Sequence, residues 1–294
     1  MKAVVIGSGG QLGQCIISQV RKKNLAKNFI FYSRSKLDIS NHNKVKETIN
    51  SIMPNIIINA SGYTDVDGAE NNKIEANKIN NLSVKNLAEV CKSTNATLIH
   101  ISTDYVFDGS SIIPYKESDK TNPKSVYGET KLAGENAIIS SGCSYVIIRT
   151  SWVYSEYGKN FMKSMLELFP QRDSINIIDD QIGCPTYAQD LAKTILILIK
   201  HIKKKEIFSE ILHFAGHEKT SWFNFAKAIL IEKQKDDKNL KCVINPIKTS
   251  EFKSLADRPK FSALDCSKIL TKFKLKPSNW NKGISDVIVN LENQ

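Results

Sequence analysis

Short apolar runs alternate with longer amphipathic stretches through the first half of the chain. The run at 3–6 (AVVI) opens the pattern, and others follow at 28–33, 55–59, 97–102 and 144–149. Runs of this length without polar alternation are typical of parallel strands buried on both faces. Apolar residues recur at helical spacing between them, at 14–23, 43–52, 73–93 and 124–140. Repeated β-α units predict an α/β protein with a Rossmann-like, doubly wound parallel sheet, and we expect residues 1–150 to form this domain.

Polar and glycine residues stand where the expected strands end. They occur at 7–13, 33–34, 60–65, 102–105 and 150–152. In an open parallel sheet, ligands bind beyond the carboxyl ends of the strands. The five segments therefore predict one common binding crevice at that edge of the sheet.

The alternation of expected strands and helices becomes less regular beyond Arg149. Helical spacing recurs at 160–169, 187–199 and 221–233, with Ser221 as a candidate helix N-cap. Short strand-like pieces stand at 175–178, 211–214 and 242–244. We expect residues 151–294 to form mainly a smaller, interleaved C-terminal substrate-binding lobe, with some later segments returning to the first domain.

Three glycines follow the first expected strand at regular spacing. Gly7, Gly10 and Gly13 form the pattern G-x-x-G-x-x-G between a strand and a helix, a relative of the dinucleotide-binding fingerprint. Glycine allows a tight turn and a close approach of the backbone to a pyrophosphate, while the following helix N-terminus attracts negative charge. This segment predicts a nucleotide-binding site.

Tyr127 and Lys131 stand four residues apart in an expected helix and so lie on one face of it. An unperturbed phenol has a pKa of ~10. A nearby ammonium favours the phenolate, so we expect Lys131 to lower the pKa of Tyr127 toward the range in which it can transfer a proton. The spacing alone also occurs by chance on surface helices. The glycine pattern near the N-terminus, between a strand and a helix, favours a catalytic pair.

The formal net charge of +11 favours an anionic partner such as a phosphorylated small molecule. Small lysine clusters at 203–205 and 233–241 are interpreted as solvated surface. No zinc-finger, RNA-binding or basic-aromatic repeat occurs, so we expect no nucleic-acid partner. No apolar run reaches the ~20 residues that span a bilayer, so we expect no membrane partner.

The six cysteines are scattered and form no C-x-x-C pair, and the five histidines show no paired ligand spacing. Such cysteines are typical of reduced, packed thiols in a cytoplasmic protein. We therefore predict a cytoplasmic protein without a zinc site.

Eight segments, spread in order over nearly the whole chain, can be compared with known families. They are GSGGQLGQ at 7–14, STDYVFDG at 102–109, PYKESD at 114–119, NPKSVYGETKLAGE at 122–135, RTSWVY at 149–154, DQIGCPTYAQDLA at 180–192, SWFNFA at 221–226 and RPKFSALDCSK at 258–268. In this order and spacing, the chain resembles the extended short-chain dehydrogenase/reductases. More narrowly, it resembles the dTDP-4-dehydrorhamnose reductase family.

The resemblance implies NAD(P)H-dependent reduction of the C4 keto group of dTDP-4-dehydro-6-deoxy-L-mannose. The product would be dTDP-L-rhamnose, which is used for cell-surface polysaccharides such as lipopolysaccharide. Tyr127 would donate the proton, and Lys131 would hold the nicotinamide ribose. Thr103 would hydrogen-bond the carbonyl oxygen, and Asp104 would contact the sugar or tune Tyr127. A turn or helix cap is the alternative for Thr103 and Asp104.

Further contacts follow from the same resemblance. Trp152 would flank the sugar ring, or it is a buried structural residue. Arg258, together with Ser262, would engage the diphosphate, because Arg binds phosphate bidentately. An interdomain salt bridge is the alternative for Arg258. Asn80 would help to organise the proton path, or it is an ordinary polar helix residue.

The implied cofactor site gathers around the expected crevice. Its residues are Gly7, Gly10, Gln11, Leu12, Gly13, Arg34, Asp38, Ile39, Ala60, Ser61, Gly62, Tyr127 and Lys131. In this architecture an acid after the second strand favours NAD, whereas Arg favours NADP. Arg34 stands there, with no acid before Asp38, so the sequence favours NADPH, with NADH as the alternative.

The chain departs from the family pattern at two places. It has Asn59-Ala60-Ser61-Gly62 where the family often has Asn-Ala-Ala-Ala, which still leaves room for the cofactor. Cys15 stands where some members carry a Glu that helps to hold a metal between two subunits. We therefore predict no metal, while a homodimer stays open.

Two alternative functions stay open as well. The first is another nucleotide-sugar reductase or a C4 epimerase of the same superfamily; an epimerase would keep tightly bound NAD. The second is a non-catalytic NADP-binding regulatory subunit that resembles the methionine adenosyltransferase β-subunit and binds a partner protein. The intact set of Thr103, Tyr127 and Lys131 favours an enzyme.

Overall fold

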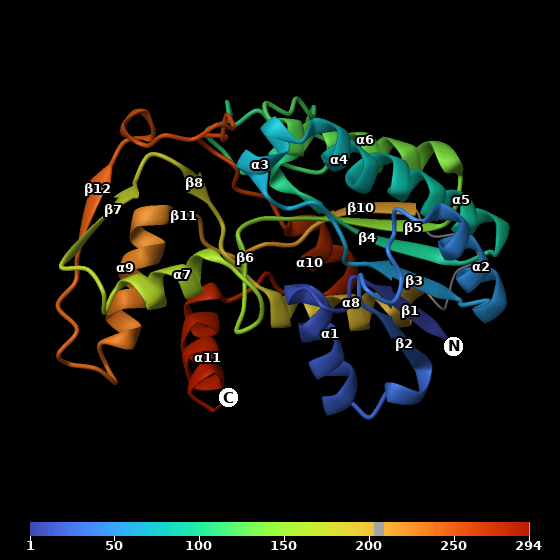
Figure 1. Cartoon of the computed structure of the whole chain (residues 1–294), viewed down its shortest axis with the longest axis horizontal. Coiled ribbons are helices and arrows are strands. Elements are labelled where there is room, and N and C mark those ends of the chain that lie inside the picture. The colour runs from blue at the N-terminus through green and yellow to red at the C-terminus, as the bar shows by residue number, and fades with distance from the viewer. Residues whose placement is uncertain (203–208, 294) are drawn as a thin grey trace.

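A parallel β-sheet forms the centre of the computed structural model, which describes residues 1–202 and 209–293. Within these residues the sheet has six strands: β1 (Ala3–Ile6), β2 (Phe29–Tyr32), β3 (Ile56–Asn59), β4 (Thr97–Thr103), β5 (Tyr145–Thr150) and β10 (Ser209–His213). Their order across the sheet is β2-β1-β3-β4-β5-β10, and all neighbours are parallel (Figure 1). The predicted doubly wound parallel sheet is confirmed.

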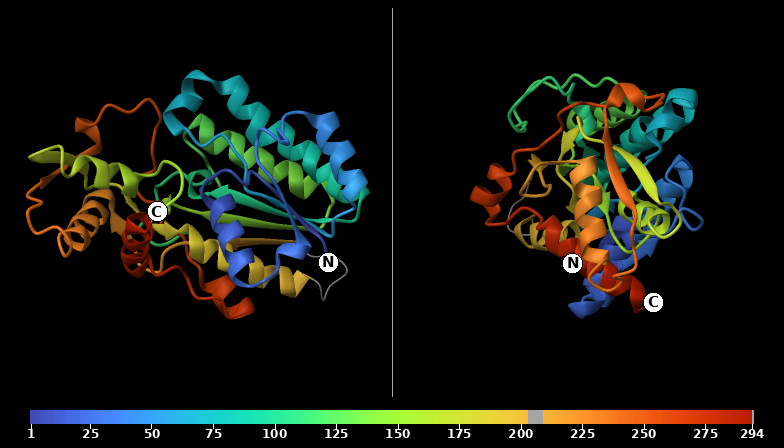
Figure 2. Two further views of the ribbon diagram at one scale, coloured as in Figure 1. Left: turned by 60° about the horizontal axis from the view of Figure 1, so that its bottom comes forward. Right: turned by 90° about the vertical axis from the view of Figure 1, so that its left-hand side faces the viewer.

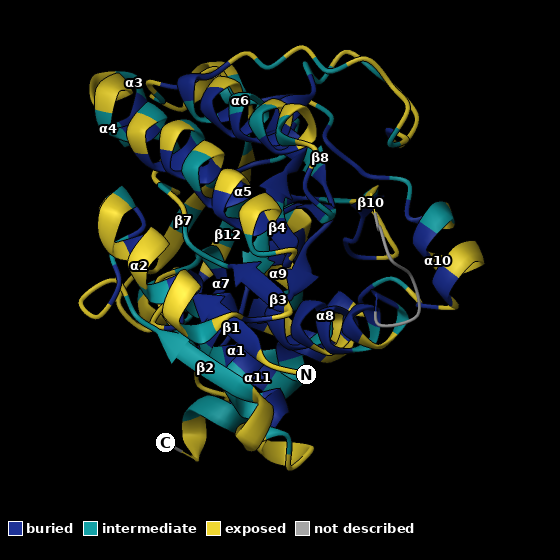
Figure 3. Ribbon diagram, turned by 90° about the vertical axis from the view of Figure 1, so that its right-hand side faces the viewer, coloured by how far each residue is buried: buried dark blue, intermediate teal, exposed yellow. Residues whose placement is uncertain are grey.

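Helices cover both faces of the sheet (Figure 2). One face carries α1 (Gln11–Lys22) and α8 (Ala188–Ile202), and the other carries α2 (His42–Ile52), α5 (Ser83–Ser93) and α6 (Val126–Ser141). Strand side chains alternate between these layers. Ala3 and Val5 pack toward α1 and α8, whereas Val4 and Ile6 pack toward α2 and α5. The central strands are therefore buried, while the edge strand β2 is only half-buried (Figure 3).

The strand order reverses at β1. The chain passes from β1 to β2 on one side and then crosses to β3 on the other side of β1. Ligands of doubly wound sheets bind in the crevice at such a switch point. The segments that follow β1 and β3 therefore border the expected ligand site.

A second, smaller body lies beyond β5, at the left of Figure 1. It contains α7 (Phe161–Leu168), α9 (Trp222–Lys233) and α11 (Trp280–Glu292), and the strand pairs β6 (Val153–Tyr154) with β9 (Thr186–Tyr187), β7 (Ser174–Ile178) with β12 (Val243–Ile247), and β8 (Ile182–Gly183) with β11 (Thr220–Ser221). These elements enclose their own core around Tyr154, Phe225 and Ile229.

The chain returns to the large sheet after entering this body. Helix α8 packs on α1, β10 pairs with β5, and α10 (Ser267–Phe273) packs beside β10. These later elements belong spatially to the sheet, although they follow residue 150 in the chain. The domain boundary at residue 150 stays a prediction.

Several elements differ from the sequence expectation. The single helix expected at 73–93 is divided into α4 (Lys73–Asn77), a π-helical turn (Lys78–Leu82) and α5. In the π-helical turn the Ser83 amide donates to the Lys78 carbonyl, and the Ser83 hydroxyl donates to the same carbonyl at 2.7 Å. The sequence reading missed α3 (Val66–Asn71), α10, α11 and the 3₁₀ turns at Ala26–Asn28, Asp104–Val106 and Thr249–Glu251. The lysine cluster at 203–205 lies outside the described residues. In the described part of the chain, no helix is both long and apolar enough to cross a membrane.

Candidate active site

The backbone of the glycine turn after β1 packs closely against the segment after β3 and against the start of α1. Gly7 has φ +85°, and a Cβ there would lie 2.6 Å from the Ser61 amide nitrogen. A Cβ on Gly13 would lie 2.4 Å from the Gly7 carbonyl oxygen. Both positions therefore need glycine. Gly10 is the N-cap of α1 and offers no capping side chain, so the first amides of α1 can meet an anion.

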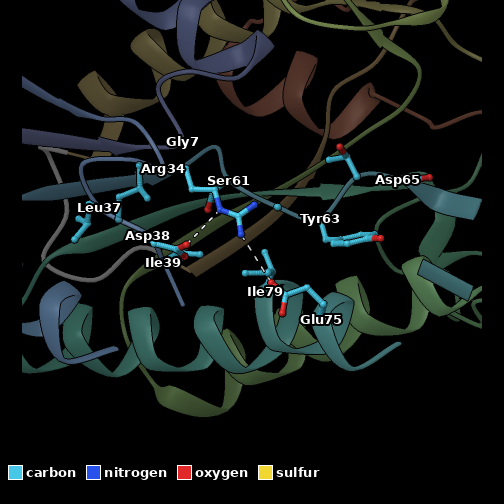
Figure 4. A pocket seen from close by; sticks show the side chains of 13 residues that line it. Gly7, Arg34, Leu37, Asp38, Ile39, Ser61, Tyr63, Asp65, Glu75 and Ile79 are labelled. Carbon is cyan, nitrogen blue, oxygen red and sulfur yellow. Dashed lines mark hydrogen bonds and ion pairs between the residues drawn. The ribbon is translucent and has the colours of Figure 1, made fainter. Parts of the chain in front are cut away.

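A pocket of about 420 Å³ opens beside this turn, at the switch point of the sheet (Figure 4). It is lined by Ile6, Gly7, Arg34, Leu37, Asp38, Ile39, Ser61, Gly62, Tyr63, Thr64, Asp65, Glu75 and Ile79. Six of the residues expected at the cofactor stand in this lining. The structure thus brings together the segments that follow β1, β2 and β3.

The Arg34 guanidinium extends across this pocket between two carboxylates (Figure 4). Its Nε lies 3.2 Å from Asp38 Oδ2, and its Nη2 lies 3.9 Å from Glu75 Oε1. The Arg34 side chain is 77 % exposed, so solvent screens both pairs and leaves the guanidinium accessible to an anion. Arg34 lowers the pKa of Asp38 together with the hydrogen bonds from Ser40, against a rise from burial.

Gln11 and Leu12 face away from the pocket. The Gln11 side-chain oxygen accepts hydrogen bonds from Ser155 Oγ at 2.9 Å and Asn160 Nδ2 at 3.0 Å, which ties α1 to the smaller body. The Leu12 side chain packs in the core of the sheet layer. Only their backbone amides therefore remain for a phosphate. Ala60 is half-buried and donates its amide to Ile6 at 2.9 Å.

Thr103 and Asp104 lie at the carboxyl end of β4, and both are buried. The Thr103 hydroxyl donates to Asp104 Oδ1 at 3.0 Å and accepts from the Tyr105 amide at 3.2 Å. Burial raises the pKa of Asp104 to about 6, although the hydroxyls of Ser262 and Thr103 oppose the rise. Thr103 also caps a short 3₁₀ turn, so the capping alternative describes part of its role.

Tyr127 stands in the first turn of α6, after the N-cap Ser125. Its ring meets the Tyr105 ring edge-on, with centroids 5.6 Å apart. Burial raises the pKa of Tyr127, the Thr103 hydroxyl lowers it, and the charge of Asp104 raises it further. The expectation that Lys131 lowers this pKa is wrong for these contacts, because the ammonium is directed elsewhere.

Lys131 is buried one turn further along α6. Its Nζ donates to the Ile101 carbonyl at 2.6 Å and lies 3.3 Å from His100 Nε2. Burial lowers the pKa of Lys131 to about 8, and the charge of Glu135 opposes this change. Lys131 therefore titrates much closer to neutrality than an exposed lysine does.

Trp152 follows β5 in an unusual backbone conformation, with φ +46°. Its ring stacks on the Trp222 ring of α9, with centroids 3.5 Å apart and planes within 8°. Trp152 is half-buried, so it combines a packing contact with an accessible edge.

Arg258 forms an ion pair with Asp67, with Nη2 2.5 Å from Oδ2, and its Nη1 donates to the Tyr105 hydroxyl at 3.2 Å. Asp67 belongs to α3, so the contact joins the sheet layer to the C-terminal segment, as the salt-bridge alternative expected. The Asp67 carboxylate also accepts the amides of Leu255 and Ala256, both at 3.0 Å.

Asn80 lies in the π-helical turn and fixes the segment after β3. Its Oδ1 accepts from the Tyr63 amide at 2.9 Å, and its Nδ2 donates to the Tyr63 carbonyl at 3.1 Å and to Thr130 Oγ1 at 3.2 Å. Asn80 is buried, and these contacts hold the segment after β3 against α6.

Cys15 is fully buried, and burial raises the pKa of its thiol.

The sequence reading missed three features. Asn59 and His100 are paired across β3 and β4, and their polar side chains in otherwise apolar runs were the available signal. Trp222 stacks on Trp152, and the segment SWFNFA carried that residue. A cavity of about 810 Å³ opens between residues 109–112, which follow β4, and the smaller body, where it is lined in part by Lys219, Asn224, Lys260 and Phe261.

Comparisons with known proteins agree with this architecture. The family model described as "RmlD substrate binding domain" matches residues 1–293. A dTDP-4-dehydrorhamnose reductase of Aggregatibacter actinomycetemcomitans is 39 % identical over 293 residues, which cover 97 % of this chain and 98 % of the relative.

Two solved structures are similar along the whole chain. A dTDP-4-dehydrorhamnose reductase from Clostridium acetobutylicum has a TM-score of 0.91 at 35 % identity, with 99 % of this chain and 100 % of that chain covered. The reductase from Bacillus anthracis, crystallised in complex with NADP, has a TM-score of 0.88 at 33 % identity with the same coverage. The chain therefore belongs to the dTDP-4-dehydrorhamnose reductase family, a family of oxidoreductases.

Proposed function

We propose that this protein reduces the C4 keto group of dTDP-4-dehydro-6-deoxy-L-mannose with NADPH to give dTDP-L-rhamnose. The observation that carries the proposal is the position of Tyr127 in the first turn of α6 beside Thr103 and Asp104 at the end of β4, where the Thr103 hydroxyl and the Asp104 charge both act on the pKa of Tyr127. The three relatives described above are named dTDP-4-dehydrorhamnose reductases, which supports the same reaction.

The residues around the switch point fit a dinucleotide. Gly7 and Gly13 leave no room for a Cβ, and α1 begins without a capping side chain, so its amides suit a pyrophosphate. The pocket beside them suits the adenosine half, with Asp38 and Ile39 in its wall. Arg34 would hold the 2′-phosphate of NADPH. The cofactor, when bound, supplies the hydride. The NADP complex of the Bacillus anthracis relative supports the choice of NADPH over NADH.

Tyr127 would provide the proton for the alkoxide that forms at C4. Its pKa is raised by burial, so its hydroxyl stays protonated at neutral pH and is ready to donate. Thr103 would hold the reacting carbonyl oxygen by a hydrogen bond. The Thr103 hydroxyl has a single hydrogen, which it donates to Asp104 at 3.0 Å, so this hydrogen would turn from Asp104 to the carbonyl oxygen when the substrate binds.

The smaller body would bind the dTDP-sugar. Trp152, braced by Trp222, would place the sugar ring. The cavity of about 810 Å³ offers Lys219 and Lys260 to an anionic group. Arg258 would act indirectly, because its guanidinium is engaged by Asp67.

We also place the protein in the cytoplasm. All six cysteines are buried, unpaired thiols, which supports a reducing compartment. One copy of the chain supplies every side chain named above, so the proposed chemistry needs no homodimer.

The experiment is a product analysis. The purified protein is incubated with NADPH and dTDP-4-dehydro-6-deoxy-L-mannose, and NADPH consumption is compared with the sugar formed, identified by NMR. We expect one dTDP-L-rhamnose for each NADPH oxidised. Sugar conversion without NADPH consumption would favour an epimerase, and NADPH binding without any conversion would favour a binding subunit; either result overturns the proposal.

A further inference from the structure

A cluster of hydrogen bonds joins the short helix α3 to the segment 254–258, which follows β12 of the smaller body. Oδ1 of Asp67 in α3 accepts from the Ser254 hydroxyl at 2.8 Å. The same oxygen accepts from the Leu255 and Ala256 amides, both at 3.0 Å. One carboxylate of the sheet layer therefore fixes the backbone of a segment that comes from the smaller body.

The same carboxylate pairs with the guanidinium of Arg258. Asp67 Oδ2 lies 2.5 Å from Arg258 Nη2, and both residues are half-buried. Burial raises the pKa of Asp67, but its hydrogen bonds and the charge of Arg258 lower this pKa to about 2, so the group is a carboxylate at neutral pH. A lone ion pair between mobile, exposed side chains holds little in place. This pair differs, because the backbone amides on Oδ1 fix the carboxylate.

All three nitrogens of the Arg258 guanidinium have partners. Besides the contact of Nη2 with Asp67, Nε donates to Ser254 Oγ at 3.3 Å. Nη1 donates to the Tyr105 hydroxyl at 3.2 Å. A guanidinium is planar, and its N–H bonds have fixed directions. The contacts of Nη2 and Nε therefore determine where Nη1 points, and hence where it holds the Tyr105 hydroxyl.

Tyr105 lies between Arg258 and the residues proposed for proton transfer. Its ring meets the Tyr127 ring edge-on, with centroids 5.6 Å apart. Its amide donates to Thr103 Oγ1 at 3.2 Å. A Cβ on Gly128, the residue after Tyr127, would overlap the Tyr105 carbonyl oxygen, so the two backbones are in close contact. Because packed side chains leave little free space, a displaced Tyr105 ring would displace the Tyr127 ring.

Helix α3 also reaches Tyr127 by a second route. Ala69 of α3 belongs to a small apolar cluster on which Tyr127 packs. Glu70 of α3 accepts the Val126 amide at 2.9 Å, at the start of α6. This packing route does not pass through the Tyr105 hydroxyl, so the two routes can be separated by substitution.

We propose that Asp67, Arg258 and Tyr105 are positioning residues that hold the proton donor Tyr127 in place. Asp67 fixes the guanidinium of Arg258, which fixes the Tyr105 hydroxyl. The Tyr105 ring then fixes the Tyr127 ring. The role in turnover rests on the proposed function, but the placement of Tyr127 does not. A segment of the substrate-binding body would thereby set the position of a catalytic residue of the sheet layer.

NMR of the whole protein tests the placement of Tyr127 without substrate or cofactor. The chain has nine tyrosines, so ¹³Cζ labelling of tyrosine gives few signals, and Tyr127→Phe assigns that of Tyr127. Asp67→Asn keeps an oxygen for the amides of the segment but turns an NH₂ group toward Arg258, so that two donors meet. We expect the Tyr127 signal to move in Asp67→Asn. A Tyr127 signal that stays in place would overturn the proposal.

Asp180→Asn is the matched control. Asp180 Oδ1 accepts from the Thr249 amide at 2.8 Å and from the Thr249 hydroxyl at 2.6 Å, so it holds the chain shortly before the segment 254–258. The same substitution there keeps an oxygen for both bonds. The Tyr127 signal should therefore be the same in Asp180→Asn as in wild type.

Tyr105→Phe separates the two routes. It removes the hydroxyl that Arg258 contacts and keeps the ring that meets Tyr127. In this background Asp67→Asn should no longer move the Tyr127 signal. An equal movement in both backgrounds would mean that α3 acts by packing alone, which would overturn the proposal. Arg258→Met replaces Asp67→Asn in the same comparison if the latter does not fold.

Turnover provides the second readout. In Asp67→Asn, kcat should fall about tenfold or more with a smaller change in KM, because a misplacement of about 1 Å can cost about 100-fold in rate. Asp180→Asn should keep the wild-type kcat. An unchanged kcat in Asp67→Asn, or losses that simply multiply when Tyr105→Phe is added, would overturn the proposal. A wild type without turnover, whose Tyr127 signal responds as expected, would contradict only the proposed function.

Discussion

The buried ion pair between Glu135 and Arg149 fastens α6, the helix that carries Tyr127 and Lys131, to the sheet. Arg149 Nη2 lies 2.7 Å from Glu135 Oε2, and Arg149 Nε lies 3.0 and 3.2 Å from the two carboxylate oxygens. The Ser102 hydroxyl also donates to Glu135, and both charged side chains are at most 4 % exposed. Arg149→Met would keep most of the volume and leave the carboxylate of Glu135 buried with one donor.

Removing one partner of a buried ion pair costs about 3–5 kcal/mol, because the other charge stays uncompensated. A protein of this kind is stable by about 5–15 kcal/mol, so Arg149→Met should lose about a fifth of the total or more. The double variant Glu135→Met with Arg149→Met should recover most of the loss, since an apolar pair of similar volume is often neutral.

Urea unfolding followed by circular dichroism measures these free energies. Arg34→Met is the matched control, because the same substitution there removes ion pairs from a side chain that is 77 % exposed and should cost at most about 1 kcal/mol. A loss below about 1 kcal/mol for Arg149→Met, or no recovery in the double variant, would refute the reasoning.

Three further substitutions test the site. Gly13→Ala should weaken NADPH binding about tenfold or more in a fluorescence titration, because the new Cβ would lie 2.4 Å from the Gly7 oxygen; Gly9→Ala, whose nearest contact is 3.7 Å away, is the control, and equal effects would contradict the packing argument. Arg34→Ala should reduce the preference for NADPH over NADH by about 10- to 100-fold in kcat/KM, since a charged hydrogen bond contributes about 1.5–3 kcal/mol; an unchanged ratio would remove Arg34 from the phosphate site. The raised pKa of Asp104, about 6 against 3.8, means that its ionisation costs stability as pH rises through this range. Asp104→Asn should therefore be more stable than wild type by up to about 3 kcal/mol at pH 8 and equal to it near pH 4, as unfolding at both pH values would show.

The sheet could be predicted because its central strands are short, mostly apolar runs. β1, β3 and β4 are buried on both faces, so no polar alternation obscures them. Helix α11 was not predicted, although Trp280, Ile284, Val287 and Ile288 have helical spacing.

The sequence predicted which residues lie around the pocket, but it did not predict which atoms their side chains contact. Gly7, Arg34 and Asp38 converge because the ends of parallel strands meet at one edge, which the strand pattern already implies. The direction in which Lys131 reaches could not be predicted, since the spacing to Tyr127 says nothing of the Ile101 carbonyl below it. The salt bridge of Arg258 likewise depends on Asp67, which is 191 residues away in the chain.

The most direct test of the central claim compares wild type with Tyr127→Phe in NADPH oxidation driven by dTDP-4-dehydro-6-deoxy-L-mannose. The account predicts rapid oxidation by wild type. It predicts unchanged folding and NADPH binding in the variant, with a loss in kcat of about 100-fold or more, because a general acid contributes about 10²–10⁴-fold. A wild type that binds NADPH but never oxidises it with this sugar, or a variant as fast as wild type, would contradict the account.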